Sequence, residues 1–145
     1  MAYSFEHFAV LFVKLNRHWN DIASEEMGKY DIKGKYAVYL LILKDSKEDL
    51  TASILSKIAG KDKADVSRAV KCFEENGLVK LKGDSSYRAV IKITAKGRKL
   101  IGRIETRMDE IVNEAAADVS DAQQETMLKV FDKMGKIIDD KYYRE

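Results

Sequence analysis

Residues 50–93 constrain the fold of this chain more than any other segment, because two short helices and two short strands follow one another there. The first helix begins after Thr51, an N-cap candidate, and ends at Gly60, which can take the left-handed conformation that closes a helix. Asp62 caps the second helix, and Gly77 lies just past its end. The sequence therefore predicts a helix-turn-helix with a short turn.

Each of these helices has an apolar face. We expect Ile54, Leu55 and Ile58 to point inward from the first helix. The second helix should bury Val66, Ala69, Val70 and Phe73. Its outer face carries small, polar and basic residues, namely Lys63, Ala64, Asp65, Ser67, Arg68 and Lys71. Such a surface just after a tight turn suits a helix that enters the major groove of DNA.

Two strands, residues 78–82 and 88–93, follow with a rough period of two, and the polar residues 83–87 between them are typical of a turn. A helix-turn-helix followed by a hairpin is a winged helix-turn-helix, whose hairpin can reach the neighbouring minor groove or the DNA backbone. The same module also occurs as a protein-assembly module that touches no DNA. That function stays as the alternative.

Positive charge is concentrated in the same part of the chain. Residues 51–107 contain 14 Lys and Arg against 6 Asp and Glu, a net charge of +8. The remaining residues contain 12 against 18, a net charge of −6, so the whole chain carries only +2. Because clustered positive charge is the footprint of phosphate binding, this distribution favours a nucleic acid as the partner.

Length and composition indicate one soluble globular domain. The chain has 145 residues, of which 46% are hydrophobic and 34% charged, which suffices for a core. It has no apolar run of 18 residues, its N-terminal residues are not expected to form a signal peptide, and its single cysteine fits a reducing compartment. We therefore expect a cytoplasmic protein without a membrane partner. No phosphate loop, no nucleophile with a paired base and no metal motif occurs, which predicts a non-enzyme without cofactor or metal.

Both ends of the chain are expected to form apolar helices. The N-terminal stripe consists of Phe5, Phe8, Phe12, Leu15, Trp19 and Ile22. Ser120 and Gln123 resemble a capping box that would open a last helix, whose apolar residues include Met127, Leu128, Phe131, Met134, Ile137 and Ile138. Such stripes predict that the two ends pack together and against those of a second chain, with a folded-back monomer as the alternative. The expected interface comprises Phe5, Phe8, Phe12, Leu128, Phe131, Met134, Ile138 and Tyr142.

With this order of elements, the chain resembles the MarR (multiple antibiotic resistance regulator) family of winged helix-turn-helix transcription regulators over essentially its whole length. The matching motifs are Leu55-Ser56-Lys57, Gly60, Asp62, Val66-Ser67-Arg68, Val70, Phe73-Glu74, Gly77-Leu78-Val79 and Ile93-Thr94-Ala95-Lys96-Gly97. The last of these is similar to the family's junction between the second strand and the following helix.

The resemblance implies a mainly α fold of six helices with a small β-hairpin wing, in a single domain over residues 1–145. Residues 1–30 and 118–145 would be dimerisation helices, residues 36–93 the winged helix-turn-helix, and residues 94–117 a long connecting helix. It also implies a homodimeric repressor on a pseudo-palindromic operator in double-stranded DNA. A small phenolic or lipophilic effector would weaken that binding.

Three positions depart from the family's pattern. The family's wing carries Asp-x-Arg, with the arginine seven residues before the junction threonine, but here Tyr87 occupies that place and Arg88 follows it. Either the wing is one residue shorter or Arg88 takes the role from a shifted position. Lys61 replaces an apolar residue in the turn, and the helix after Ile32 lacks a proline that is common there.

The candidate DNA-contacting residues are Ser53, Lys61, Lys63, Ala64, Asp65, Ser67, Arg68, Lys71, Lys82, Tyr87 and Arg88. Arg68 either reads guanine through two hydrogen bonds or holds a phosphate. Asp65 either accepts a hydrogen bond from a cytosine amine or, as an acidic residue of the first turn, stabilises the positive N-terminal end of the helix dipole. A candidate effector pocket lies between the dimer helices and the DNA module. Its residues are Phe12, His18, Trp19, Tyr36 and Tyr39. The alternative is that these side chains only pack in the core.

Overall fold

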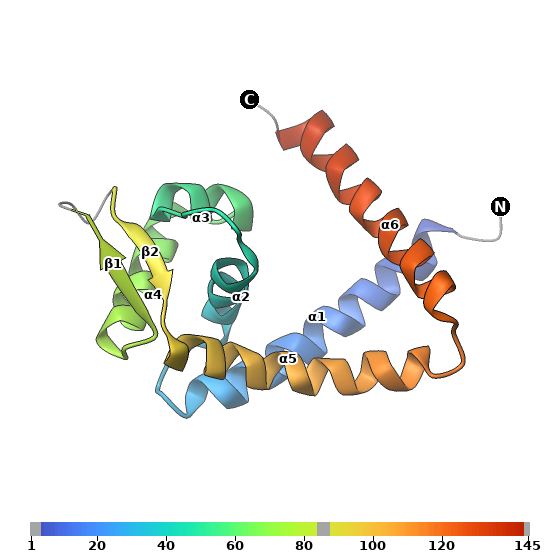
Figure 1. Cartoon of the computed structure of the whole chain (residues 1–145), viewed down its shortest axis with the longest axis horizontal. Helices are drawn as coiled ribbons and strands as arrows, with labels where there is room; N and C mark the ends of the chain where they lie inside the picture. Colours follow the sequence, from blue (N-terminus) through green and yellow to red (C-terminus); the bar gives the residue numbers. More distant parts are fainter. Residues whose placement is uncertain (1–3, 84–87, 144–145) are drawn as a thin grey trace. The chain divides into compact units, whose positions relative to one another are not determined.

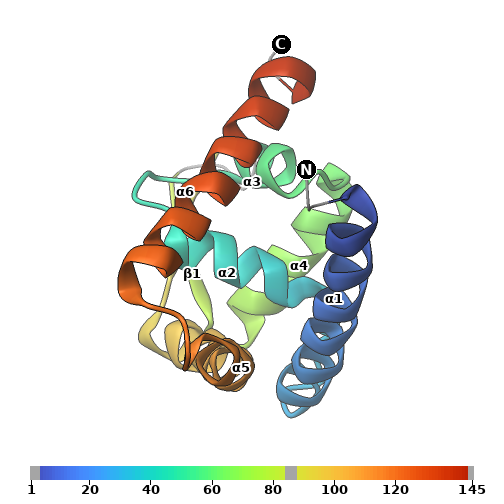
Figure 2. The ribbon, with the colours of Figure 1, turned by 90° about the vertical axis from the view of Figure 1, so that its right-hand side faces the viewer.

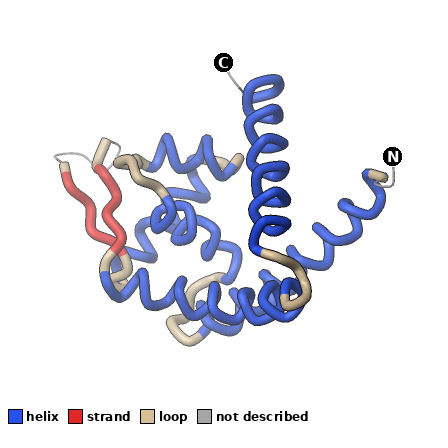
Figure 3. Tube along the Cα trace, turned by 45° about the vertical axis from the view of Figure 1, so that its right-hand side comes forward, coloured by secondary structure: helices blue, strands red, loops and turns tan. Residues whose placement is uncertain are grey.

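A computed structural model describes residues 4–83 and 88–143, and in these residues the chain forms six α-helices and one β-hairpin (Figures 1 and 3). The helices are α1 (Phe5–Gly28), α2 (Ala37–Asp45), α3 (Ala52–Ala59), α4 (Lys63–Glu75), α5 (Ala95–Ala116) and α6 (Asp121–Ile138), and the strands are β1 (Val79–Lys82) and β2 (Val90–Ile93). A 3-10 turn, η1 (Gly34–Tyr36), leads into α2, and a π-helical turn, η2 (Asp139–Tyr143), follows α6. The predicted fold class, mainly α with a small hairpin, is confirmed. The chain divides into two compact units, residues 1–108 and 109–145.

The helix-turn-helix begins and ends where local chemistry predicts. The Thr51 hydroxyl accepts a hydrogen bond from the Ile54 amide (3.3 Å), and the Asp62 carboxylate accepts one from the Ala64 amide (3.1 Å). Gly60, with φ at 63°, takes the left-handed conformation that stops α3. These caps satisfy backbone groups that a helix end leaves without partners, so α3 and α4 are separated by a tight turn.

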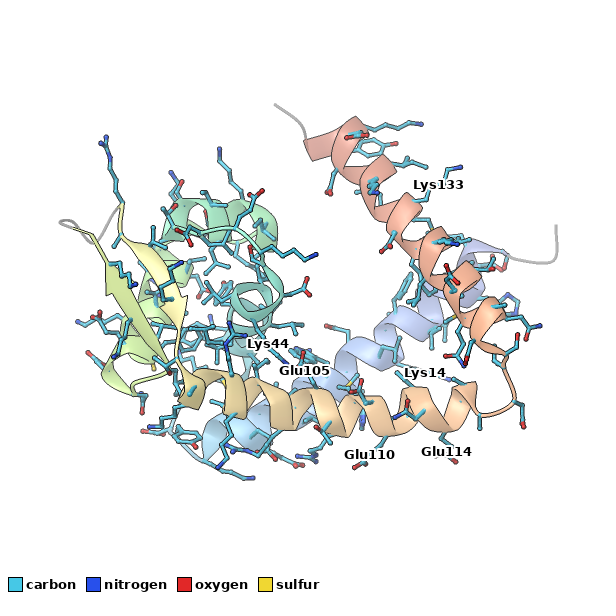
Figure 4. The ribbon with its side chains drawn as sticks, in the orientation of Figure 1. Lys14, Lys44, Glu105, Glu110, Glu114 and Lys133 are labelled. Carbon is cyan, nitrogen blue, oxygen red and sulfur yellow. The ribbon has the colours of Figure 1, made fainter. Side chains whose placement is uncertain are left out.

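The core of the first unit lies among α2, α3, α4, the hairpin, the first half of α5 and the C-terminal end of α1. Its largest fully buried side chains are Tyr39, Phe73, Met27, Leu40, Leu55, Leu78, Leu100, Ile101, Ile104, Val66 and Val79. Burying each large apolar side chain contributes about 1.5–3 kcal/mol. Figure 2 shows α2 running below α3 within this unit, and these two helices are in contact. An ion pair between Lys44 and Glu105, whose side chains point toward each other in Figure 4, also joins α2 to α5.

The outward face of α3 differs from the prediction. Leu55 is buried, but the side chains of Ile54 and Ile58 are 42% and 55% exposed. A helix of eight residues offers two neighbouring apolar edges, and the core takes the edge of Leu55 and Ala59. Ile54 and Ile58 share the other edge because they are one turn apart. The expectation that both isoleucines point inward is therefore wrong.

The hairpin is antiparallel and shorter than predicted. Val79 pairs with Ile93 and Lys82 pairs with Val90, so each strand has four residues in place of the five and six expected. An additional bridge joins β2 to the residue before the helix-turn-helix, because the Ile91 amide donates to the Leu50 carbonyl (2.8 Å). The wing is thus hydrogen-bonded to the chain on both sides of α3 and α4.

The junction between β2 and α5 fixes the end of α4. The Thr94 hydroxyl accepts from the Gly97 amide (3.1 Å) and donates to the Gly77 carbonyl (2.7 Å), so Thr94 caps α5. The Thr94 amide also donates to the Leu78 carbonyl (2.9 Å). A Cβ on Gly97 would lie 2.3 Å from that same carbonyl oxygen. Only glycine lets the two backbone segments approach this closely.

A buried carboxylate joins α1 to α5. Glu26 is 5% exposed and accepts hydrogen bonds from Lys29 (2.9 Å), Arg103 (3.3 Å) and Arg107 (3.2 Å). The hydrogen bond from Lys29, more than any other contact, holds the pKa of Glu26 below its usual value, against the opposing effect of burial. The charge is therefore retained inside the unit because three cations surround it.

The second unit contains the end of α5 and all of α6. Ser120 and Gln123 form the predicted capping box, in which the side chain of each accepts from the backbone amide of the other (3.3 and 3.0 Å). None of the residues of α6 is buried, although Met127, Leu128, Val130, Met134, Ile137 and Ile138 are large and apolar. Within the described ranges, none of the helices has the length and apolar character needed to cross a membrane.

Candidate nucleic-acid interface

Helix α4 presents the polar and basic face that the sequence predicts. Five candidate DNA-contacting residues on it are exposed, namely Lys63, Ala64, Ser67, Arg68 and Lys71. The opposite face carries the buried Val66, Ala69, Val70 and Phe73. Because these apolar residues hold α4 against the core, the exposed face is presented as a fixed surface rather than as a mobile loop.

A groove of about 440 Å³ lies on one side of α4, between α3 and β1. Four of the candidate DNA-contacting residues line it, Ser53, Lys63, Ser67 and Lys71, together with Ala52, Val70, Glu74 and Leu81. The structure thus brings together two ammonium groups and two hydroxyl groups from two helices. Such donors are typical contacts for phosphate oxygens.

Asp65 does not belong to this outward face. Its carboxylate accepts from the Tyr39 hydroxyl (2.6 Å) and from the Lys35 ammonium (2.8 Å), and it lies 3.5 Å from the Arg68 guanidinium. Only 16% of its side chain is exposed. Asp65 is the acidic residue of the first turn of α4, and the N-cap of that helix is Asp62. Both carboxylate oxygens already have donors within the protein, so the structure favours the first-turn role of Asp65, and the contact to cytosine stays a prediction.

The electrostatics of this cluster favour a charged Asp65 and a neutral Tyr39. The hydrogen bonds from Lys35 and then from Tyr39 lower the pKa of Asp65 to about 2. Burial, and next the hydrogen bond to Asp65, raises the pKa of the Tyr39 hydroxyl above its ordinary value. The Tyr39 hydroxyl thus stays protonated and donates to a permanent carboxylate.

A cleft of about 640 Å³ lies on the other side of α4, toward α1 and α2. It is lined by Asn16, Trp19, Asn20, Lys35, Val38, Tyr39, Lys61, Asp62, Asp65 and Arg68. Of the candidate effector residues, Trp19 and Tyr39 lie on this cleft, and Tyr36 is buried with its ring edge-on to Phe73. Phe12 and His18 do not line it, and Phe12 stacks on Phe8 instead.

Three polar residues of the cleft were missed by the sequence-based prediction, namely Asn16, Asn20 and Lys35. The two asparagines are one turn apart on α1 and flank the position of Trp19, so their helical spacing could have indicated a shared face. Lys35 gave no comparable signal, because its partner Asp65 is 30 residues away. In the described parts of the chain, the His, Cys, Asp and Glu side chains form no group of three that could hold a metal ion.

The wing contributes exposed cations at both of its described sides. Lys82 ends β1, and Arg88 lies two residues before β2 begins, and both side chains are exposed. Tyr87 lies outside the described residues. Because Lys82 pairs with Val90, Arg88 falls beyond the last paired position of the hairpin.

Comparison with known proteins gives a clear result for structure alone. No protein-family model and no curated protein matches this sequence. A MarR-family transcriptional regulator from Silicibacter pomeroyi is similar in structure over 98% of this chain and 95% of its own, with a TM-score of 0.74 and 20% identity. Staphylococcus aureus MarR in complex with salicylate and kanamycin matches over 94% and 93%, with a TM-score of 0.71 and 16% identity.

A third similar structure contains DNA. A mutant of Staphylococcus aureus MepR bound to an oligodeoxyribonucleotide matches over 90% of this chain and 97% of its own, with a TM-score of 0.57 and 21% identity. Identities this low establish a shared fold alone, and each of the three structures covers 90% or more of this chain. The chain therefore has the winged-helix fold of the MarR-family transcriptional regulators, as the resemblance in its sequence predicted.

Proposed function

We propose that this chain is a sequence-specific DNA-binding transcription regulator, a repressor that acts as a homodimer on a pseudo-palindromic operator. The observation that carries the proposal is the exposed face of α4, where Lys63, Ser67, Arg68 and Lys71 stand out from a helix fixed by its buried side. The MepR structure with a bound oligodeoxyribonucleotide has the same fold. An enzymatic role has no support in the fold or in these residues.

Arg68 is the residue best suited to read a base. Its side chain is 64% exposed at the second turn of α4, and a guanidinium can donate two hydrogen bonds to the O6 and N7 atoms of guanine. The ammonium groups of Lys63 and Lys71 suit phosphates, which position the helix without reading sequence. Arg88 extends the positive surface to the wing, where a narrow minor groove attracts arginine.

Mobility shifts with fragments from upstream of the protein's own gene test DNA binding. Binding should weaken steeply as salt rises, because each neutralised phosphate releases counterions. Absence of a shift with every fragment at low salt would contradict the proposal and favour a protein-assembly module.

Single substitutions test the roles within the interface. Arg68→Ala should cost about 1–3 kcal/mol of binding free energy and relax the preference at one base pair. Arg88→Ala should weaken binding evenly across sequences and lower the salt slope by about one contact. Lys14→Ala, which removes an exposed cation from α1 (Figure 4), is the matched control and should bind like the wild type. Equal losses in all three variants would contradict these assignments.

The proposed dimer rests on apolar surface at both chain ends. Phe5 is 81% exposed and Leu128 is 58% exposed, and no residue of α6 is buried. At 3.6 residues per turn, the apolar side chains from Ile137 round to Leu128 cover about half of the circumference of α6. A face so wide needs more than one neighbouring helix, and a second copy of the chain supplies them.

Size-exclusion chromatography with light scattering tests the dimer. The double substitution of Phe131 and Ile138 by Asp should give monomers or unfolded chains, because it places two charges within the apolar face. Lys133→Asp alters the charge on the polar side of the same helix (Figure 4) and should remain dimeric. A folded monomer of the wild-type protein would refute the dimer.

The cleft beside α4 supports a further proposal, that a small phenolic or lipophilic acid binds there and weakens DNA binding. Trp19 and Tyr39 offer aromatic surfaces, and Lys35 and Arg68 offer cations to a carboxylate. A structure of the same fold contains salicylate. Trp19 is the single tryptophan, so salicylate titration should change its fluorescence and release DNA over the same concentration range. A flat response to salicylate and related phenolic acids would assign these aromatic residues to packing alone.

A further inference from the structure

We infer that Asp65 is a positioning residue for Arg68: it holds the guanidinium over the first turns of α4 and so determines which base pair the arginine reads. The inference rests on the proposed DNA binding and names a residue that sets its specificity. Asp65 itself is turned away from the outer face and touches no base in this role.

Asp65 lies between the buried Tyr39 of the core and the exposed side chain of Arg68. One carboxylate oxygen, Oδ2, accepts from the Tyr39 hydroxyl at 2.6 Å, and Tyr39 is among the most deeply buried residues of the core. The other oxygen, Oδ1, lies 2.8 Å from the Lys35 Nζ and 3.5 Å from the Arg68 Nη2. The position of Arg68 is therefore coupled through one carboxylate to the core.

Such coupling matters because an arginine side chain is long and flexible. A guanidinium that is restrained before binding loses less conformational freedom when it meets a base. The contact to Asp65 is made through Nη2, and a guanidinium has five N–H donors. Donors therefore remain for a guanine edge while the ion pair is kept.

Lys35 and Arg68 approach the same carboxylate oxygen of Asp65. Removing each partner in turn therefore distinguishes two roles of Asp65, anchoring α4 and positioning Arg68. Lys35 joins the carboxylate to the segment before α2, whereas Arg68 joins it to the reading face of α4. If Asp65 only anchored the helix, loss of Lys35 and loss of the carboxylate charge would have similar effects. If Asp65 positions Arg68, only loss of the charge changes base preference.

The test uses the full-length protein and a DNA fragment that the wild type binds, with each base pair varied in turn. Asp65→Asn keeps an oxygen for the Tyr39 hydroxyl but removes the charge that holds Arg68. It should lower the preference about tenfold at the one base pair where Arg68→Ala loses it. The double variant should show no further loss at that pair, because the two residues act as one unit.

Two single variants serve as controls. Lys71→Ala should weaken binding to all sequences equally, as expected for a phosphate contact. Measured without an effector, Lys35→Met should retain the wild-type base preference, since the Asp65 charge and Arg68 are unchanged. Circular dichroism and thermal unfolding confirm that each variant is folded before its preference is measured.

Two outcomes would overturn the inference. One is a uniform loss of affinity in Asp65→Asn with the base preference intact, and the other is the same relaxed preference in Lys35→Met. Both leave the proposed function standing, because the wild type still binds DNA with preference. Failure of the wild type to bind any fragment would instead refute the proposed function, so the two failures are distinguishable.

Discussion

Replacement of Gly97 by alanine should destabilise the protein, although the same change in most helices is favourable. A Cβ at this position would lie 2.3 Å from the Leu78 carbonyl oxygen and 2.8 Å from the Ile93 Cγ1 atom. The carbonyl cannot easily retreat, because it accepts a hydrogen bond from the Thr94 amide at 2.9 Å. Relief of the clash must therefore move α5 away from the end of α4.

The expected magnitude follows from two opposing effects. Alanine in place of glycine in a helix gains about 0.5–1 kcal/mol, whereas forcing an extra methyl group into a packed site costs about 1–3 kcal/mol. Because the clash at Gly97 is with backbone, we expect its cost to lie near the upper end of that range of about 1–3 kcal/mol. The net decrease in the free energy of unfolding should then be about 1–2 kcal/mol. Gly102 is the matched control, because it lies in the same helix and a Cβ there meets nothing within 4 Å.

Urea unfolding at one fixed protein concentration measures both variants, since the stability of the proposed dimer would depend on concentration. Gly102→Ala should be more stable than the wild type by about 0.5–1 kcal/mol. Gly97→Ala should be less stable and should also bind DNA more weakly, because the end of α4 moves. Equal stability of the two variants would refute the argument from close approach.

Three further predictions follow from the hydrogen bonds described above. Thr94→Val removes the cap of α5 and the bond to the Gly77 carbonyl, and should lower the free energy of unfolding by about 0.5–2 kcal/mol in urea. Glu26→Gln leaves Arg103 and Arg107 without the buried charge, and should cost about 1–3 kcal/mol by the same measurement. Because the pKa of Asp65 is lowered from 3.8 to about 2 on folding, its charge stabilises the fold fully above about pH 5 and progressively less as the pH falls toward 2. The stability difference between the wild type and Asp65→Asn should accordingly be constant above pH 5 and shrink in acid, and a constant difference down to pH 2 would contradict the ion pairs.

The parts of the fold that the sequence predicts are those set by local chemistry. Thr51, Asp62, Thr94 and Ser120 are caps because a short polar side chain just before a helix can accept from the free amides of its first turn. Ile54 shows where this reasoning stops. Its spacing fits an apolar edge of α3, but which of two edges meets the core depends on how α4 packs against it.

In the candidate site, too, some features follow from local spacing and others depend on tertiary packing. The exposed residues of α4 follow from helical spacing, which is why Lys63, Ser67 and Arg68 lie where they were expected. The partners of Asp65 could not be found by spacing, because Lys35 and Tyr39 precede it by 30 and 26 residues and reach it only in the folded structure. Pairings of this kind are tertiary, and no local pattern specifies them.

The hydrogen bond between the Ile91 amide and the Leu50 carbonyl encloses the whole helix-turn-helix in a closed ring of chain. Separation of β2 from the segment before α3 must open this ring, and opening it also exposes Leu50 and Ile91, which are both buried. These elements should therefore unfold as one cooperative unit. In native-state hydrogen exchange, the amide of Ile91 should share a single opening free energy with those of Val66, Val70 and Phe73.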